Sequence, residues 1–141
     1  MLVDANLLLY AVDEQSPFHT AARAWLESAL NGPRRVAIPW TSLIAFLRIA
    51  THPRALEEPM TPHDAWQQIE EWLDAPATWV PLPGRGHREI LGRLVRELDL
   101  HGNLVADAAL AALCIEHGLQ VASADSDFAR FAEITWINPV A

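Results

Sequence analysis

The sequence predicts an α/β fold with a mostly parallel sheet, because short apolar runs alternate with helical patterns along the whole chain. Residues 103–128 show this best: a helical stripe ends at Gly118, and the short, nearly uncharged run 119–124 follows. Such runs are typical of strands in the middle of a parallel sheet. At 141 residues without repeats or linkers, the chain is expected to form a single domain over residues 1–141.

The elements are predicted in order from apolar periodicity and from Gly and Pro stop signals. The expected strands are 1–3, 36–40, 78–82, 119–124 and 135–137. The expected helices are 7–12, 17–30, 43–50, 62–73, 87–98 and the helix that begins at residue 103. Asn6, Thr41 or Ser42, and Asn103 are candidate N-caps, because their side chains can accept from unpaired backbone N–H groups. Pro62 suits the first turn of its helix.

Composition excludes several function classes. The formal charge is −8, which is unusual for a nucleic-acid-binding protein unless acids gather to hold cations. All ten basic residues are arginine, which excludes lysine-dependent phosphate loops and Schiff-base chemistry. No apolar run approaches the roughly 18 residues of a membrane span. The start M-L-V-D lacks a signal-peptide pattern, so a cytoplasmic location is expected. The single Cys114 lies on an apolar helical stripe and reads as a core thiol.

Three acids map to the same edge of the predicted sheet. Asp4 ends the first strand, Asp125 follows the run 119–124, and Asp107 lies near the start of the preceding helix, beside its apolar stripe. Asp127 is two residues beyond Asp125. Ligands of open α/β sheets gather beyond the carboxyl ends of the strands, so these carboxylates are expected to converge there.

Converging carboxylates need a proton or a cation. At about 4 Å and an effective dielectric near 20, each pair costs roughly 4 kcal/mol. Oxygen ligands without a nearby His or Cys favour Mg²⁺ or Mn²⁺ over Zn²⁺, and the six histidines show no zinc-site spacing. Mg²⁺ held by a few carboxylates prefers phosphate as a further ligand, which makes phosphoryl chemistry the leading hypothesis.

Each acid also has a purely structural interpretation. Asp4 could cap the first helix, and Asp107 could pair with an arginine distant in sequence. Asp125 could form an Asx turn, and Asp127 could cap a turn at 128–131.

Four motifs in order resemble the PIN-domain ribonucleases, and specifically the VapC toxins of toxin–antitoxin pairs. They are V-D-A-N-L-L-L-Y-A at 3–11, P-W-T-S-L-I-A-F-L-R-I-A-T at 39–51, G-N-L-V-A-D-A-A-L-A-A-L at 102–113 and S-A-D-S-D-F-A-R-F at 123–131. The resemblance implies a three-layer α/β/α sandwich. It also implies a metal-dependent endoribonuclease, acting on structured or single-stranded RNA and leaving a 3′-hydroxyl and a 5′-phosphate.

The resemblance carries over residue by residue. It implies Mg²⁺ or Mn²⁺ ligands at Asp4, Asp107 and Asp125, with Asp127 as a further candidate, and supporting polar groups at Asn6 and Ser123. The family usually has a glutamate on the helix after the second strand, where this chain has Ala45. With one ligand missing, one tightly held ion is expected rather than two. Glu57 or Glu58 could replace it only by folding back.

Partners follow from the same resemblance. A homodimer and a small antitoxin that wraps the toxin and plugs the acidic site are expected. Candidates to guide the RNA backbone are four arginines, since no lysine is present: Arg48, Arg54, Arg85 and Arg88. Most of the six tryptophans are expected in the core, with Trp66 and Trp72 as interface candidates. The RNA target cannot be inferred from the sequence.

Three other functions were weighed. A phosphatase using Asp125-Ser126-Asp127 would normally have its nucleophilic aspartate after the first strand and a second acid two residues later. Here Asn6 occupies that second position, and the lysine that such enzymes use is absent. A receiver-like phospho-switch also needs a lysine. The non-enzymatic alternative is a catalytically weakened PIN domain that only binds antitoxin or RNA, which Ala45 motivates.

Overall fold

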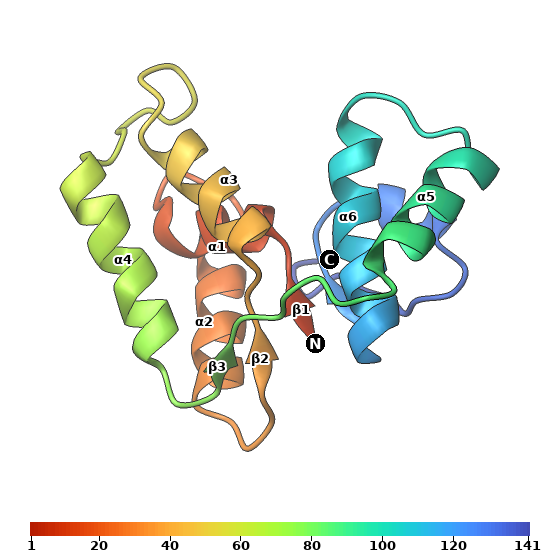
Figure 1. Ribbon diagram of the computed structural model, residues 1–141. Helices are drawn as coiled ribbons and strands as arrows, with labels where there is room; N and C mark the ends of the chain where they lie inside the picture. Colours follow the sequence, from red (N-terminus) through yellow and green to blue (C-terminus); the bar gives the residue numbers. More distant parts are fainter.

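The computed structural model describes residues 1–141 and contains a five-stranded, entirely parallel sheet between two helical layers (Figure 1). The strands are β1 (Leu2–Val3), β2 (Val36–Ala37), β3 (Thr78–Trp79), β4 (Val121–Ala122) and β5 (Trp136–Ile137). Their order across the sheet is β3-β2-β1-β4-β5. The chain therefore builds outward from β1 in one direction and then returns to add β4 and β5 on its other side.

Four helices cover one face of the sheet and two cover the other. Figure 1 shows the two layers on either side of the strands. The first layer is α1 (Ala5–Val12), α2 (His19–Leu30), α3 (Trp40–Ala50) and α4 (Pro62–Asp74). The second layer consists of α5 (His87–Glu97) and α6 (Asn103–His117). The short 3₁₀ helix η1 (Ser126–Arg130), which follows β4, packs against α6. The three-layer α/β/α prediction is confirmed.

Alternation along the short strands divides the core in two. Leu2 packs with the α5–α6 layer, whereas Val3 packs with the α1–α4 layer. Val121 and Ala122 alternate in the same way. Because side chains of a strand point to opposite faces in turn, two residues are enough to anchor each strand in both layers. Cys114 is buried in the α5–α6 layer, which confirms the core thiol, and burial raises its pKa to about 12.

All predicted strands and helices are present, although every strand is shorter than predicted. The predicted N-caps are mostly wrong. Asp4 caps α1, Pro39 precedes α3, and Gly102, with a φ of 55°, precedes α6. The prediction for α4 holds: Pro62 opens it. Gly118 ends α6 in the left-handed conformation, as predicted.

The tryptophans divide between core and surface. Trp72 is buried and packs edge-on against Phe46, with ring centroids 4.8 Å apart. Trp40 and Trp66 are both 41% exposed, and their rings stack at 6.4 Å. Trp72 therefore belongs to the core, and Trp66 remains available to a partner.

Candidate metal centre

The acidic residues lie where the direction of strand addition reverses. β1 and β4 are neighbours, with Val3 opposite Ala122, so Asp4 and Ser123 leave the sheet side by side. The backbone N–H of Asp4 donates to the Ala122 carbonyl at 3.0 Å, which extends the ladder to this point. In parallel α/β sheets, ligands bind at such a switch point, outside the carboxyl ends of the strands.

Ser123 is the hub of the site. Its hydroxyl is fully buried, donates to Asp4 Oδ2 at 2.7 Å, and accepts from Asn6 Nδ2 and from the Asp125 N–H, each at 3.0 Å. Asn6 Oδ1 accepts from the Ala124 N–H at 3.3 Å, which fixes the orientation of the amide. A serine hydroxyl offers one proton and two acceptor positions, and all three are used here. The proton therefore points at Asp4.

Asp4 is both a helix cap and a member of the site. Its Oδ1 accepts from the Ala5 N–H at 2.7 Å, so the capping interpretation is correct but incomplete. Burial raises the pKa of Asp4, the hydrogen bonds from Ser123 and Ala5 act in the opposite direction, and the charge of Asp125 adds to the increase. Both oxygens are thus oriented by donors before any ligand arrives.

Asp125 and Asp127 are positioned by one tight turn. Asp125 Oδ1 accepts from the Asp127 N–H at 2.8 Å, which caps η1 and makes the expected Asx turn. Asp127 is therefore not the cap. Its Oδ1 accepts instead from Arg130 Nη2 at 3.1 Å. Arg130 is the nearby cation that the sequence offers, and this half-exposed pair neutralises only Asp127 directly.

Asp107 faces these acids from α6. One carboxylate oxygen from each of Asp107, Asp125 and Asp127 lies within 4.8 Å of the other two. Burial, followed by the charges of Asp125, Asp4 and Asp127, raises the pKa of Asp107 to about 6, while Arg130 opposes this. Asp107 makes no ion pair, so its alternative interpretation, a pair with an arginine distant in sequence, is wrong.

The three acids that lie closest together are not the three that the sequence favoured as ligands. Asp127, the weaker candidate, belongs to the three-acid group, whereas Asp4 lies beside it and is joined to Asp125 through Ser123. Ala45 is half-buried on α3, and Glu57 and Glu58 are exposed in the following loop. No glutamate joins the group.

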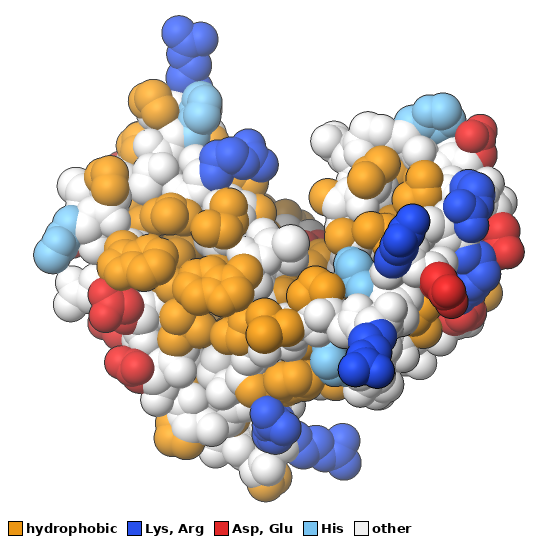
Figure 2. Space-filling view, in the orientation of Figure 1, with side chains coloured by type: hydrophobic (Ala, Val, Ile, Leu, Met, Phe, Trp, Pro, Cys, Tyr) orange, Lys and Arg blue, Asp and Glu red, His pale blue; other side chains and the backbone are white.

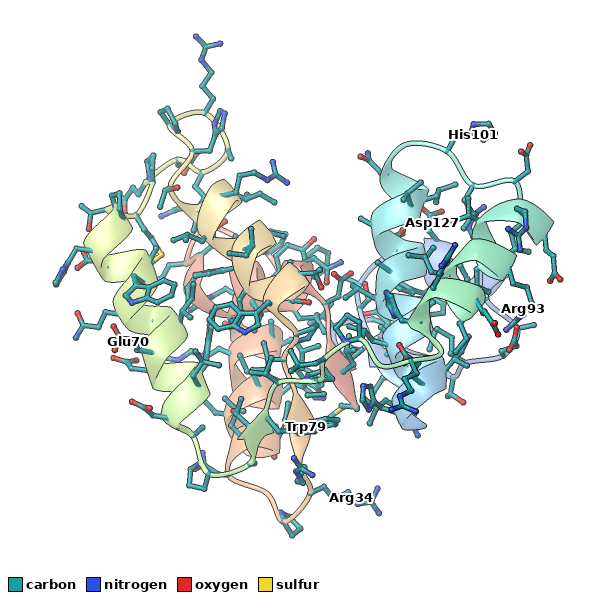
Figure 3. The ribbon with its side chains drawn as sticks, viewed as in Figure 1. Arg34, Glu70, Trp79, Arg93, His101 and Asp127 are labelled. Carbon is teal, nitrogen blue, oxygen red and sulfur yellow. The ribbon has the colours of Figure 1, made fainter.

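The donor chemistry fits a hard divalent cation. The group contains only carboxylate oxygens, without His or Cys, which is the ligand set of Mg²⁺ and Mn²⁺. Its charge is unbalanced, because four aspartates face a single arginine that is already paired with Asp127. A cation would relieve the repulsion that adds to the effect of burial on the pKa of Asp107. Figure 3 shows Asp127 beside α6.

Two supporting side chains were missed from the sequence. The Ser42 hydroxyl donates to the Val3 carbonyl at 2.8 Å, and Trp136 Nε1 donates to the Ser123 carbonyl at 2.9 Å. The first fixes the end of β1 directly before Asp4, and the second holds the backbone of Ser123 itself. Both contacts join segments distant in sequence, so no local pattern could have revealed them.

The four candidate RNA-binding arginines are exposed and make no ion pair. Arg48 lies in the last turn of α3, and Arg54 lies in the turn after it. Arg85 precedes α5, and Arg88 lies in its first turn.

None of the helices combines the length and apolar character needed to cross a lipid bilayer.

Comparison with protein families gives one match over most of the chain: the PIN-domain model aligns with residues 1–134. Curated relatives from Mycobacterium tuberculosis are similar along the whole chain. "Ribonuclease VapC37" is 41% identical over 140 residues, covering 99% of this chain and 97% of the relative. "Ribonuclease VapC33" is 39% identical over 140 residues, covering 99% and 98%.

Solved structures share the fold at low sequence identity. VapBC2 from Rickettsia felis bound to a promoter DNA fragment aligns with a TM-score of 0.70 at 15% identity, covering 97% of this chain and 96% of that one. FitAcB from Neisseria gonorrhoeae aligns with a TM-score of 0.68 at 21% identity, covering 98% and 96%. A toxin–antitoxin complex from Klebsiella pneumoniae aligns at 0.65 and 18%, covering 98% and 96%.

Proposed function

This chain belongs to the PIN-domain family and to its VapC ribonucleases, and we propose that it is a metal-dependent endoribonuclease, the toxin of a toxin–antitoxin pair. The observation that carries the proposal is the three-carboxylate group at the sheet switch point, with oxygens within 4.8 Å and Asp4 locked beside it. Such a group is costly unless a cation binds, and hydrolysis of a phosphodiester is the chemistry that this cation serves.

The metal is Mg²⁺ or Mn²⁺, held by Asp107, Asp125 and Asp127, with Asp4 as a direct or water-bridged ligand. When bound, such an ion neutralises charge on the scissile phosphate and makes water more acidic. The chain itself orients the ligands: Ser123 and Asn6 fix Asp4, and the Asp125 turn fixes Asp127. The group contains no His, so its aspartates are the candidate side chains for accepting the proton of the attacking water.

RNA must approach a site that is itself negative. The exposed, unpaired arginines Arg48, Arg54, Arg85 and Arg88 supply the opposing charge, and they are carried by the two helical layers. Figure 2 shows the surface hollowed between α3 and α6, with arginine side chains on both sides of the hollow. Arginine suits this task because its planar fork binds phosphate with two hydrogen bonds.

The antitoxin binds the groove between α2 and α4 and extends toward the acids. This groove has a volume of about 530 Å³ and combines apolar Leu26, Met60 and Trp72 with the unpaired acids Glu14 and Glu71. That lining suits a segment with apolar and basic side chains. Reversing charge with Glu14→Arg and Glu71→Arg should weaken the complex in a co-purification assay. Glu70→Arg, on the same helix but outside the groove, should not.

A second copy of the chain covers the exposed apolar surface on α3 and α4 (Figure 2). Trp40, Ile44, Trp66 and Leu82 are 41%, 54%, 41% and 61% exposed. Exposed apolar patches of this kind mark interaction surfaces. Size-exclusion at several concentrations should show a homodimer that Ile44→Glu dissociates, and a strict monomer for the unaltered chain would contradict this.

Ala45 keeps the second candidate open, a catalytically weakened PIN domain that binds antitoxin or RNA. Purified, antitoxin-free protein should be incubated with total RNA, with Mn²⁺, with Mg²⁺ and with excess EDTA, beside Asp4→Asn and the control Asp99→Asn. Asp99 is exposed at a φ of 49°, which asparagine tolerates. Cleavage that needs metal and Asp4 supports the ribonuclease, while full activity in EDTA would contradict it. RNA binding without cleavage supports the binding protein.

A further inference from the structure

The end of α3 and the turn after it form a small cationic pocket. Its volume is about 150 Å³, and it is lined by Arg48, Ile49, His52, Arg54 and Ala55. The lining holds two guanidinium groups and one imidazole, and it contains no acid. In a chain of formal charge −8, two arginines and a histidine facing one pocket without an acid are a notable concentration of hydrogen-bond donors.

These donors are not needed to end the helix. The carbonyls at the end of α3 are already satisfied, because Thr51 donates its N–H at 3.3 Å and its hydroxyl at 2.8 Å to Leu47. The His52 N–H donates to the Ile49 carbonyl at 3.1 Å. Arg48 and Arg54 make no ion pair, although Glu57 and Glu58 lie a few residues further along the same loop. Both guanidinium groups thus remain free to bind a ligand.

His52 is oriented as a third donor. Its Nδ1 accepts from the Arg54 N–H at 3.1 Å, so the neutral ring carries its proton on Nε2. The Ala55 N–H donates to the His52 carbonyl at 3.3 Å and closes the turn. The loop returns to α3 where the Met60 N–H donates to the Ala50 carbonyl at 2.8 Å. These backbone contacts hold the turn that carries His52 and Arg54.

The pocket lies at the far end of the helix that begins beside the acids. Ser42, in the first turn of α3, is bonded to the Val3 carbonyl directly before Asp4. Arg48 is six residues further along the helix, a rise of about 9 Å. Figure 1 shows α3 leading from the sheet to the loop that follows it, on one side of the gap opposite α6.

We propose that Arg48, His52 and Arg54 form a phosphate-binding pocket, which holds the RNA backbone to one side of the bond that is cut. The proposal rests on the ribonuclease function above and assigns one anchor point for the substrate. Two arginine forks and one imidazole N–H match the oxygens of a phosphodiester, and the absence of acids removes competition for them.

The test compares two double variants with equal charge change. R48Q/R54Q removes the pocket, and R34Q/R96Q removes two exposed arginines that make no ion pair, one in the turn before β2 and one in the last turn of α5. First, the site of cleavage is mapped in an RNA that the unaltered protein cuts. Oligonucleotides ending one, three or five nucleotides beyond that site, on either side, are then compared by kcat/KM. RNA binding is measured against salt concentration with Asp107→Asn added, so that no cleavage occurs.

The unaltered protein and R34Q/R96Q should gain kcat/KM, through KM, when the RNA is lengthened on one side of the cut. R48Q/R54Q should not gain, and should bind the long RNA about tenfold more weakly. The slope of log K against log salt should fall by about 1.4 for two lost phosphate contacts. Equal gains or equal slopes in the two variants would overturn the pocket and leave the ribonuclease intact. An unaltered protein that neither cuts nor binds RNA would overturn both.

Discussion

The sheet-edge half and the helix half of the acidic group are built differently. At the sheet edge, Asp4 and Asp125 are held by hydrogen bonds through Ser123 and by the N–H groups of their own turns. Asp107, on α6, has no hydrogen-bond partner, and burial followed by repulsion from the neighbouring acids raises its pKa to about 6. The sheet-edge half is thus preorganised, because its carboxylates are already oriented by hydrogen bonds. The helix half supplies a negative charge that no hydrogen bond or ion pair offsets. Orientation and the need for a cation come from different parts of the fold.

Removing a carboxylate from either half should have the largest effect. Asp107→Asn and Asp125→Asn should each reduce RNA cleavage about a thousandfold or more, because both remove a proposed ligand of the metal. Cleavage rates at saturating Mn²⁺ measure this, with Asp99→Asn as the matched control. If Asp107→Asn kept full activity, the helix half would have no part in the chemistry.

Loosening only the sheet-edge half should have a smaller effect. Ser123→Ala leaves Asp4 Oδ2 and the Asp125 N–H without their partner, while all carboxylates remain. Loss of such a supporting contact should lower activity or metal affinity about 10–100-fold. It should also cost about 1–3 kcal/mol of stability. Titration with Mn²⁺ and urea unfolding would report the two effects. Ser126→Ala, on the exposed side of the same turn, should change neither.

The charge of the helix half should appear as a pH dependence of metal-free stability. The folded pKa of Asp107, about 6, lies above its ordinary 3.8, so the folded protein retains a proton that the unfolded chain has lost. Stability should therefore fall as pH rises from about 4 to 6 and stay low above that. The whole pKa difference corresponds to about 3 kcal/mol in the free energy of unfolding. Solvent screening at this half-exposed position reduces the expected effect to about 1 kcal/mol.

Asp107→Asn should remove that fall, so the variant should be the more stable protein at pH 8 in EDTA. Added Mn²⁺ should reverse the order, because the cation stabilises only the protein that binds it. Thermal unfolding at pH 5 and pH 8, with and without Mn²⁺, measures both. The same order at both pH values would contradict the assigned repulsion.

Arg130 should give the smallest effect. It pairs with Asp127 at a half-exposed position and partly offsets the charge on Asp107. Arg130→Gln should change stability by less than about 1 kcal/mol. It should lower the Mn²⁺ concentration for half-maximal cleavage a few-fold, because one competing cation is lost. Arg23→Gln, which removes an exposed pair on α2, is the control and should leave the Mn²⁺ dependence unchanged.

The same contrast explains what could be predicted from the sequence. Alternating patterns predicted five strands and six helices, and the rule for carboxyl strand ends brought Asp4, Asp107 and Asp125 to one edge. The caps were wrong because local propensity was overridden by distant partners. Asn6 bonds Ser123 and Ala124 instead of its own helix, and Ser42 bonds Val3.

Local sequence patterns also could not predict that Asp127 belongs to the three-acid group. A two-residue step from Asp125 is equally compatible with a helix cap and with a ligand, and only the packing of η1 against α6 decides between them. Pairing with Arg130 is local and was visible in the sequence, but its geometry was not.

The contact between Asp4 and Ser123 joins residues 119 positions apart in the chain. During synthesis, the first strand therefore waits for almost the whole chain before the pocket of acids can close. At roughly 5–20 residues per second, this delay lasts several seconds. A nascent chain that still lacks residues 121–127 has neither β4 nor two of the four aspartates. Until residues 121–127 are made, the nascent chain therefore lacks two of the carboxylates on which the proposed cleavage of RNA depends.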